Sequence, residues 1–336
     1  MKREKKMKIL LTGATGFVGR NLFHELKKNG HELRCLVRNE EKARKLFGDD
    51  ACEMIVGNVT DKDSLKGITE GIDVVYHLAG LRGHDLPSPK AFARFRHVNV
   101  EGLRNIIKQC QGTKLKKFIY ISSTAAMGLH SSYPVDEETP CKPITPYQVS
   151  KFEGEQLVWA STAAGDIPGV VIRPSRIYGP GFKGDFVTIG KLAKTGFFPR
   201  IGKGKNLSPA LFIDDIVSLL ATVKDRGKVG ETYIVSSEEE YSLEDAATIL
   251  ASAIGVHTRL VYVPRFLAIA GAWCLEVLSR LLGRKPIITA RNIRSATTKC
   301  LFDISKAKQE LGFSQQIDLE EGLVKTVAYF QRAGYL

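Results

Sequence analysis

Three glycines follow the first apolar run of the chain at three-residue intervals. Residues 8–12 form the run, Gly13, Gly16 and Gly19 come after it, and a helical pattern continues to Asn29-Gly30. The first glycine suits a tight turn, the second a close approach of backbone to a pyrophosphate, and the third close packing of helix on strand. The spacing alone occurs in many turns. Its position between a strand and a helix favours dinucleotide binding over a purely structural turn, since the helix N-terminus leaves unpaired N–H groups for phosphates.

The alternation of apolar runs and helical patterns continues beyond this first unit. Further strands are expected over the runs 32–37, 53–56, 73–77, 117–121 and 170–173. Regular alternation of this kind predicts an α/β fold built on a Rossmann-type, doubly wound parallel sheet.

The regular alternation ends after about Gly179, where the elements become mixed. We therefore predict a NAD(P)-binding Rossmann domain over residues 1–178 and a smaller C-terminal lobe over residues 179–336 that mainly binds substrate. Some segments of this lobe are expected to return to the Rossmann sheet. No long linker rich in proline or serine separates the two parts, so we expect a shared interface with a ligand cleft.

The composition is that of a folded, soluble protein, with 43% apolar and 25% charged residues. The net charge of +13 suits nucleic acid, an anionic membrane surface, phosphorylated ligands or only a solvated exterior. No nucleic-acid recognition motif accompanies the charge, so no nucleic-acid partner is expected. Part of the excess lies in the first eight residues, which read as a solvated tail. No apolar stretch of about 7–15 residues follows them before the glycines, so a cytoplasmic location is expected.

The six cysteines are scattered along the chain and form no C-x-x-C pair. Buried free thiols in a reducing compartment are therefore expected, without a disulfide framework or a zinc site. No metal is predicted. Asp136, Glu137 and Glu138 form an acidic cluster that we expect to be a solvated loop.

The end of the second predicted strand bears on the choice of cofactor. An acidic residue there usually binds the adenosine ribose 2′-hydroxyl of NAD. Here Val37 occupies the position and Arg38 follows, a cation suited to bidentate phosphate binding. We predict NADP(H) over NAD(H), with Arg38 on the 2′-phosphate and Lys42 assisting. The alternative is that Arg38 only faces solvent.

A tyrosine and a lysine four residues apart begin a predicted helix. Thr145-Pro146 resembles an N-cap and first helical residue, so Tyr147 and Lys151 share one helix face. A phenol has a pKa of about 10, and a neighbouring ammonium stabilises its phenolate. We therefore predict that Tyr147 exchanges a proton with substrate and that Lys151 lowers its pKa. Ser123, just beyond the predicted strand 117–121, would hold the substrate oxygen.

In this order the motifs resemble those of the extended short-chain dehydrogenase/reductase superfamily, over nearly the whole chain. The matching segments are 12–19, 57–59, 77–80, 99–102, 121–123, 147–151, 173–180 and 212–215. The resemblance implies a cofactor site that comprises Gly13, Gly16, Phe17, Val18, Gly19, Arg38, Asn58, Val59, Leu78, Ala79, Gly80, Ser122, Tyr147, Lys151, Pro174 and Ser175.

The resemblance also assigns individual roles. Asn58 and Val59 would border the adenine, Ala79 and Gly80 the central part of the cofactor, and Pro174 and Ser175 its nicotinamide end. The family commonly has Asp at the position of Asn58, and an amide can still bond an adenine amino group. Asn99 is the fourth predicted catalytic residue, supporting a proton path to Lys151 through water.

Within the superfamily, the pattern of residues 302–307 and 311–313 resembles the 3-beta-hydroxysteroid dehydrogenase and dihydroflavonol-reductase-like branches. Nucleotide-sugar epimerases share the core motifs, but many carry an arginine where Ser208 stands here. This loss weakens the case for a nucleotide-sugar substrate, although Lys203 or Lys205 offers a replacement cation.

Residues 264–282 are apolar on most helical faces but contain Glu276 and Arg280. The segment is too short and too charged to span a bilayer comfortably. An amphipathic helix that covers an apolar substrate or lies in a membrane interface fits it better. Plain core packing is the alternative. Peripheral contact with a membrane is therefore one possible role of this segment. A homodimer is a second possible interaction of the chain.

Together these features predict an NAD(P)-dependent oxidoreductase that interconverts a hydroxyl and a carbonyl on a mostly apolar substrate, sterol-like, lipid-like or polycyclic. A first alternative is a nucleotide-sugar epimerase or dehydratase that retains its cofactor. A second is a non-catalytic dinucleotide-binding subunit or redox sensor. The latter would be expected to have lost the proton-transfer residues, and Ser123, Tyr147 and Lys151 are all present.

Overall fold

The computed structural model describes residues 6–48, 52–83, 85–130, 133–202, 206–282, 290, 293, 297 and 300–336. A seven-stranded sheet forms its centre, in the order β10-β6-β5-β4-β1-β2-β3, and every strand pairing in it is parallel. The strands are β1 (Lys8–Thr12), β2 (Glu32–Val37), β3 (Glu53–Val56), β4 (Val74–His77), β5 (Lys117–Ile121), β6 (Gly169–Pro174) and β10 (Thr232–Val235). The predicted doubly wound α/β fold is confirmed.

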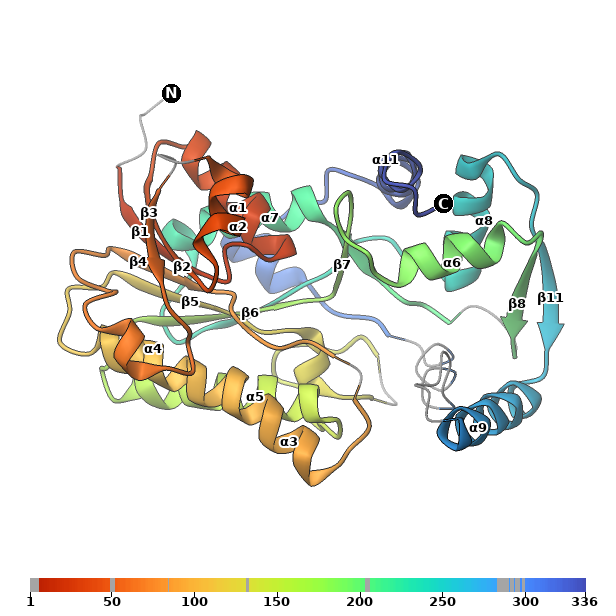
Figure 1. Ribbon diagram of the computed structural model, residues 1–336, viewed down its shortest axis with the longest axis horizontal. Coiled ribbons are helices and arrows are strands. Elements are labelled where there is room, and N and C mark those ends of the chain that lie inside the picture. Colours follow the sequence, from red (N-terminus) through yellow and green to blue (C-terminus); the bar gives the residue numbers. More distant parts are fainter. Residues whose placement is uncertain are drawn as a thin grey trace.

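Helices cover both faces of this sheet (Figure 1). One face carries α1 (Phe17–Lys28), α2 (Glu40–Phe47) and α7 (Ile213–Arg226), and the other carries α3 (Pro89–Arg96), α4 (Gly102–Cys110) and α5 (Pro146–Ala163). Short helical turns join these elements: η1 (Lys62–Leu65), η2 (His97–Glu101), η3 (Thr124–Met127) and η4 (Ala307–Leu311).

Strand β1 shows why the strands of this sheet are continuous apolar runs. Ile9 and Leu11 are buried in the cluster beneath α1 and α7, and Leu10 is buried in the cluster beneath α4 and α5. A strand covered on both faces has no solvent side that would need polar residues. Each of these side chains contributes roughly 1.5–3 kcal/mol by burial.

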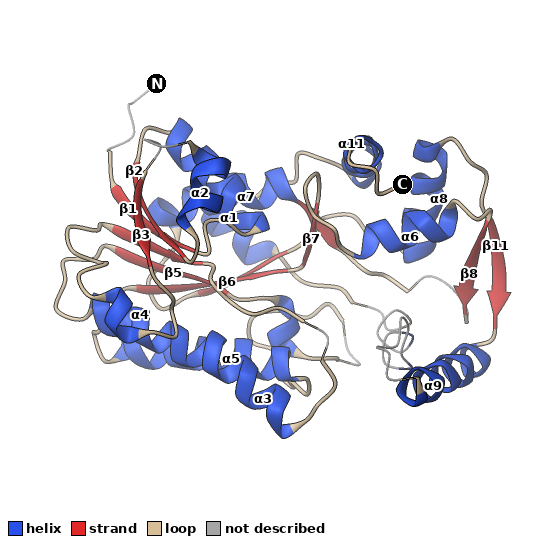
Figure 2. Cartoon of the chain, viewed as in Figure 1, coloured by secondary structure: helices blue, strands red, loops and turns tan. Residues whose placement is uncertain are grey.

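The C-terminal part of the chain divides between the sheet and a separate lobe (Figure 2). β10 pairs with β6, and α7 packs on α1. The remaining elements are β7 (Arg176–Tyr178), α6 (Asp185–Ala193), β8 (Phe197–Ile201), β9 (Ala210–Phe212), α8 (Leu243–Ile254), β11 (Arg259–Val263), α9 (Arg265–Leu281) and α11 (Leu319–Arg332). α8 packs against both α6 and α11, whereas β8, β11 and α9 lie at the end remote from the sheet.

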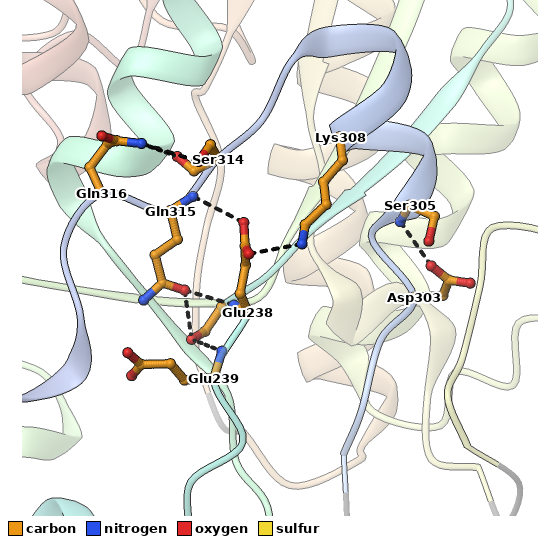
Figure 3. Close-up of polar contacts among 9 residues, drawn as sticks. Glu238, Glu239, Asp303, Ser305, Lys308, Ser314, Gln315 and Gln316 are labelled. Carbon is orange, nitrogen blue, oxygen red and sulfur yellow. Dashed lines mark hydrogen bonds and ion pairs between the residues drawn. The ribbon is translucent and has the colours of Figure 1, made fainter.

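Polar contacts tie the C-terminal segment to the loop that follows β10 (Figure 3). Glu238 accepts from the Lys308 ammonium at 2.8 Å and from the Gln315 backbone N–H at 3.1 Å. The Gln315 side-chain oxygen accepts in turn from the Glu238 backbone N–H at 2.7 Å. Asp215, at the start of α7, accepts from the Gln316 N–H at 2.9 Å. These bonds hold the end of the chain against the Rossmann layer.

Two expectations about single residues are wrong. Glu137 does not belong to a solvated loop, because its half-buried carboxylate accepts from the Ile234 N–H at 2.7 Å. The carboxylate thereby satisfies a backbone donor of β10, which is an edge strand and has no neighbouring strand on its outer side. All six cysteines are free, but only Cys35 and Cys110 are buried, and Cys274 on α9 is exposed. The basic start of the chain, residues 1–5, lies outside the described residues.

Candidate functional site

The carboxyl ends of the parallel strands meet along one edge of the sheet. The order of the chain reverses between β1 and β4, because β2 and β3 lie on one side of β1 while β5 and β6 lie beyond β4. Open α/β sheets bind ligands at such a reversal. The predicted site residues that follow these strands therefore lie along one edge.

The glycine turn forms a cradle that side chains would fill. Gly13 has a φ of +75°, and a Cβ atom there would lie 2.7 Å from the Ala79 backbone nitrogen. A Cβ atom at Gly19 would lie 2.2 Å from the Gly13 carbonyl oxygen. Gly16 is the N-cap of α1, whose first turn has neither a side-chain cap nor an acidic residue. The first N–H groups of α1 thus stay available to an anion, and the cradle fits a dinucleotide pyrophosphate.

Phe17 and Val18 begin α1 and are partly buried. The Phe17 ring stacks on the Phe182 ring, with ring centroids 4.8 Å apart. The Arg82 guanidinium lies 4.7 Å from the centroid of the Phe182 ring. The loop after β7 therefore reaches back to the glycine turn. Neither Arg82 nor Phe182 was predicted. Arg82 follows the predicted cofactor segment by two residues, which is a usable signal, whereas nothing local indicates the partner of Phe182.

A buried threonine and histidine join the ends of β1 and β4. Thr12 Oγ1 lies 2.9 Å from His77 Nδ1, and it accepts from the Ala79 N–H at 3.3 Å. Leu78 donates its N–H to the Thr12 carbonyl at 3.1 Å. Burial, with the charge of Lys151 as a smaller cause, lowers the pKa of His77 to about 3. The imidazole therefore stays neutral and holds the Thr12 hydroxyl, and Thr12 in turn positions Leu78 and Ala79.

Asn99 connects the segment after β4 with helix α5. Its side chain is buried and exchanges two hydrogen bonds with the Leu81 backbone, at 2.6 and 3.0 Å. The same amide donates to Ser150 Oγ at 2.9 Å. A Cβ atom at the neighbouring Gly80 would lie 3.3 Å from the Asn99 oxygen. Asn99 thus holds the Gly80 segment against the residue that precedes Lys151.

Helix α5 begins where the sequence predicts it. Pro146 is its first residue, and Thr145 and Gln148 form a reciprocal capping box in which each side chain bonds the other backbone N–H. Such a box holds the first helical turn in place. Tyr147 and Lys151, four residues apart, consequently project from one face of this helix.

Tyr147 is half-buried at the start of α5. Burial raises the pKa of its phenol, while a hydrogen bond with Ser123 and the positive charge of Arg82 act in the opposite direction. Burial is the largest effect on this pKa, and Arg82 supplies the positive charge that opposes it. That Lys151 lowers the pKa of Tyr147 stays a prediction. The Phe95 ring packs edge-on against the Tyr147 ring, with the ring centroids 6.2 Å apart.

The Lys151 side chain is buried. Its ammonium donates to the Ile121 carbonyl at 2.6 Å and lies 4.4 Å from the centre of the Tyr120 ring. Burial lowers the pKa of Lys151 to about 8, and the negative charge of Glu155 partly counters this effect. The ammonium therefore titrates close to physiological pH.

Glu155, one turn further along α5, forms a fully buried ion pair with Arg173 of β6. The guanidinium donates to both carboxylate oxygens, at 3.1 and 2.9 Å. The side chains of Arg173 and Glu155 are 2% and 0% exposed. Sequence reasoning missed this pair because its partners come from two elements whose pairing no local pattern reveals. It supplies the charge that supports protonation of Lys151.

Three further predicted cofactor residues lie at the ends of β5 and β6. Ser122, Pro174 and Ser175 are buried, and Ser175 donates its N–H to the Val235 carbonyl at 2.8 Å. Among the described residues, the hydroxyl oxygens of Ser122 and Ser175 are buried without a hydrogen-bond partner. Buried hydroxyl groups ordinarily have a hydrogen-bond partner, so this end of the site fits a ligand with polar groups.

The remaining predicted cofactor residues lie beyond β2 and β3. Arg38 is exposed just after β2, and the buried Val37 accepts from the Gly57 N–H at 2.9 Å. Asn58 accepts from the Thr60 N–H through its side chain at 3.2 Å. Val59 packs on α4, where a Cβ atom at Gly102 would lie 2.7 Å from its Cγ2. These residues form the far end of the same sheet edge.

Comparison with known proteins agrees with this architecture. The model of the NAD dependent epimerase/dehydratase family matches residues 9–236. The chain is 29% identical over 338 residues to UDP-glucose 4-epimerase of Vibrio cholerae, covering 98% of each protein. It is also 29% identical over 340 residues to a putative dihydroflavonol 4-reductase of Synechocystis, covering 97% of the chain and 95% of the relative.

A third relative and a crystal structure extend the comparison. The chain is 26% identical to a 3beta-hydroxysteroid-dehydrogenase/decarboxylase of Arabidopsis thaliana, covering 96% of the chain and 79% of the relative. UDP-glucuronic acid 4-epimerase from Bacillus cereus, solved with NAD, shares the fold with a TM-score of 0.77 and 24% identity. That match covers 97% of the chain and 99% of the solved structure.

Proposed function

Because the chain belongs to the NAD dependent epimerase/dehydratase family, we propose that it interconverts a hydroxyl and a carbonyl group on a mostly apolar substrate. Membership makes it an enzyme of the extended short-chain dehydrogenase/reductase type that uses a nicotinamide dinucleotide. Its relatives include epimerases, a hydroxysteroid dehydrogenase and a reductase, so the choice among these reactions is our proposal.

The proposal rests on the placement of three side chains at the start of α5 and the end of β5. Ser123 follows β5 and accepts from the Ala125 N–H at 3.2 Å, and its hydroxyl acts to lower the pKa of Tyr147. Lys151 lies one helical turn beyond Tyr147, with its ammonium on the Ile121 carbonyl. When bound, the nicotinamide ring would supply or accept the hydride. In reduction, Tyr147 would donate its proton to the carbonyl oxygen, Ser123 would orient that oxygen, and the Lys151 charge would stabilise the phenolate left behind.

The cofactor would be held along the sheet edge. Gly13, Gly16 and Gly19, with the start of α1, would bind its pyrophosphate. Further along, the segments 78–80 and 58–59 and the residues Ser122, Pro174 and Ser175 would border its other parts. Asn99 is a positioning residue in this proposal, since its bonds reach the Leu81 backbone and Ser150 rather than Lys151 itself.

We expect NADP(H) to be preferred over NAD(H) because of Arg38. This guanidinium is exposed directly after β2, next to the buried Val37, and no acidic side chain stands at that strand end. Arg38→Asp is expected to lower kcat/KM for NADPH by about tenfold or more and to leave or improve that for NADH, since a charge-assisted phosphate contact is lost. Lys45→Asp, on the adjacent α2, is the control. Equal use of both cofactors by wild type, unchanged in Arg38→Asp, would refute the assignment.

The pKa of Lys151 predicts the alkaline limit of carbonyl reduction. The ammonium form is needed to stabilise the developing phenolate, and this form is lost as pH rises through about 8. Tyr147 stays protonated over the same range, because its pKa is raised. We expect kcat/KM, which reports the free enzyme, to be flat near neutrality and to fall above about pH 8. An arginine stays charged over this range, so the residual kcat/KM of Lys151→Arg should not fall above about pH 8. If kcat/KM of the variant fell at the same pH as that of wild type, Lys151 would not be the group that sets the alkaline limit.

Apolar side chains near the proposed reacting groups support an apolar substrate. Leu86, Leu129 and Ile144 are 41%, 43% and 60% exposed. Leu86 follows the segment of Arg82, and a backbone bridge between residues 128 and 142 brings the segments of Leu129 and Ile144 together near Tyr147. Exposed apolar groups beside a catalytic group are what an apolar ligand would cover.

A substrate panel tests the proposal directly. Hydroxysteroids, flavonoid-type ketones, aldehydes and sugar nucleotides would each be offered with NADPH or NADH, and cofactor absorbance would be followed. We expect net oxidation of NADPH with apolar ketones. Conversion of a sugar nucleotide without net change in absorbance, with cofactor that copurifies, would instead establish the second candidate.

That second candidate is a nucleotide-sugar epimerase, favoured by the similarity to UDP-glucose 4-epimerase along almost the whole chain. Ser208 stands where many epimerases place an arginine, and its N–H bonds the Tyr241 carbonyl at 3.0 Å. Lys203 and Lys205, the alternative cations, lie outside the described residues. The missing arginine is our reason for placing this function second.

The proposed partners are a small-molecule substrate and the nucleotide cofactor, in agreement with the relatives. A homodimer and a cytoplasmic location stay predictions. Light scattering of the purified protein and fractionation of the source cells would check them.

A further inference from the structure

Helix α9 presents its apolar side to solvent. Six large apolar side chains on it are between 50% and 79% exposed: Phe266, Leu267, Trp273, Leu275, Leu278 and Leu281. We call these six residues the α9 face. At about 100° per residue, they fall within roughly one half of the helix circumference. Ala272 and Glu276, on the opposite side, are buried.

This orientation is the reverse of that in an ordinary surface helix, which turns its apolar stripe inward. Glu276 is buried and accepts from the Ala290 N–H at 2.6 Å. The inward side thus contains the acid and the outward side contains leucines and two aromatics. An exposed apolar surface of this size marks an interaction site.

The two-stranded ribbon that leads into α9 also exposes apolar side chains. Val261 and Tyr262 of β11 are 45% and 64% exposed, and Phe197 of the paired strand β8 is 56% exposed. β8, β11 and α9 lie together at the end of the molecule remote from the Rossmann sheet (Figure 2). None of the six residues of the α9 face is among the predicted catalytic or cofactor residues.

The chain segments that contain these elements carry nearly all of the net positive charge. Residues 186–213 include five Lys or Arg and no acid, and residues 246–302 include eight Lys or Arg and one acid, Glu276. Together they account for +12 of the net charge of +13. Arg259 and Arg265, the first residues of β11 and α9, are exposed beside the apolar side chains.

We propose that the α9 face docks on the surface of an anionic phospholipid bilayer, with the helix lying in the interface and Arg259 and Arg265 on the headgroups. Large apolar side chains with Trp, next to Lys and Arg, are the composition of interfacial helices. Docking of two copies through this face would bring two strongly basic segments together, which repulsion opposes. Among the described residues, no helix is both long and apolar enough to cross a bilayer. The inference goes beyond the proposed reaction and does not depend on it.

Tryptophan fluorescence tests the contact directly. The chain has two tryptophans, and Trp159 is half-buried and bonded to Thr232. In the variant Trp159→Phe all emission comes from Trp273. We expect a blue shift and quenching by brominated lipid on addition of vesicles of phosphatidylcholine with phosphatidylglycerol. Phosphatidylcholine alone, or high salt, should give a much smaller effect.

Vesicle co-sedimentation of matched variants completes the test. Leu278→Ser should lower the partition coefficient about tenfold, as loss of one large apolar contact predicts. Val324→Ser, on α11 and similarly exposed (48% against 52%), should leave it unchanged. Equal binding by both variants would overturn the proposal, as would absence of binding to the mixed vesicles. A lipid-free shift of Trp273 emission with protein concentration would overturn it in favour of a second copy as occupant. Turnover of soluble substrate is measured separately, so its loss would not affect this result.

Discussion

Replacement of Tyr147 with Phe is expected to lower kcat for carbonyl reduction by about a thousandfold. The variant removes one hydroxyl and keeps the ring, which meets Phe95 edge-on at 6.2 Å. The fold and the glycine cradle should therefore persist, and only the proton donor is lost. The measurement is kcat under saturating substrate, together with the dissociation constant of NADPH from fluorescence titration.

The affinity for NADPH should change little in this variant, because the cradle at Gly13 and the start of α1 is untouched. Tyr335→Phe, near the C-terminus, removes a phenol whose ring packs on Tyr329 and Phe330 of α11, and it should leave kcat unaltered. Undiminished turnover by Tyr147→Phe would remove the basis of the proposed reaction. It would favour the alternative of a subunit that binds a dinucleotide without chemistry.

Glu155→Gln is expected to lower the free energy of unfolding by about 3 kcal/mol, because it leaves the buried guanidinium of Arg173 without a counter-charge. The amide oxygen can still accept one hydrogen bond, so the effect should lie near the lower end for such changes. Denaturant unfolding, followed by circular dichroism, measures the loss.

Helix α5 offers a matched control two residues away. Glu153 pairs with Arg96 at the surface, where the two side chains are 26% and 54% exposed. Glu153→Gln should cost less than about 1 kcal/mol, since solvent screens the pair. Adding Arg173→Met to Glu155→Gln should restore part of the lost stability by removing the unpaired charge. Equal losses in Glu155→Gln and Glu153→Gln would show that burial of the pair has no energetic consequence.

The same variant connects stability with chemistry. The charge of Glu155 raises the pKa of Lys151 against the effect of burial. Its removal should therefore move the alkaline fall of kcat/KM from about pH 8 to lower pH. Glu153→Gln should leave the pH profile unchanged, which separates this electrostatic effect from a general loss of stability.

The strands and the start of the site could be predicted because their signals are local. Ile9, Leu10 and Leu11 of β1 are buried on the two faces of the sheet, so the strand is a continuous apolar run that is recognisable without a partner. Thr145 and Pro146 define the start of α5 through capping that involves only adjacent residues. The spacing of Tyr147 and Lys151 then places both on one helix face, whatever surrounds them.

Long-range contacts left no comparable signal. Glu137 belongs to an acidic run, yet it accepts from Ile234 on a strand far along the chain. Phe182 stacks on Phe17 across the glycine turn, and Arg173 meets Glu155 between a strand and a helix. Composition cannot reveal such pairs, because each partner taken alone resembles an ordinary surface or core residue.

The order of strands and helices, the glycine cradle and the alignment of Tyr147 with Lys151 can all be read from local patterns of residues. These follow from spacing along the backbone, which acts over a few residues. Three properties emerge only when distant segments pack together: burial lowers the pKa of Lys151 to about 8, burial raises the pKa of Tyr147, and the apolar side of α9 faces outward. Proton affinity and exposure depend on what surrounds a side chain, and those surroundings come from segments that meet only in the folded protein.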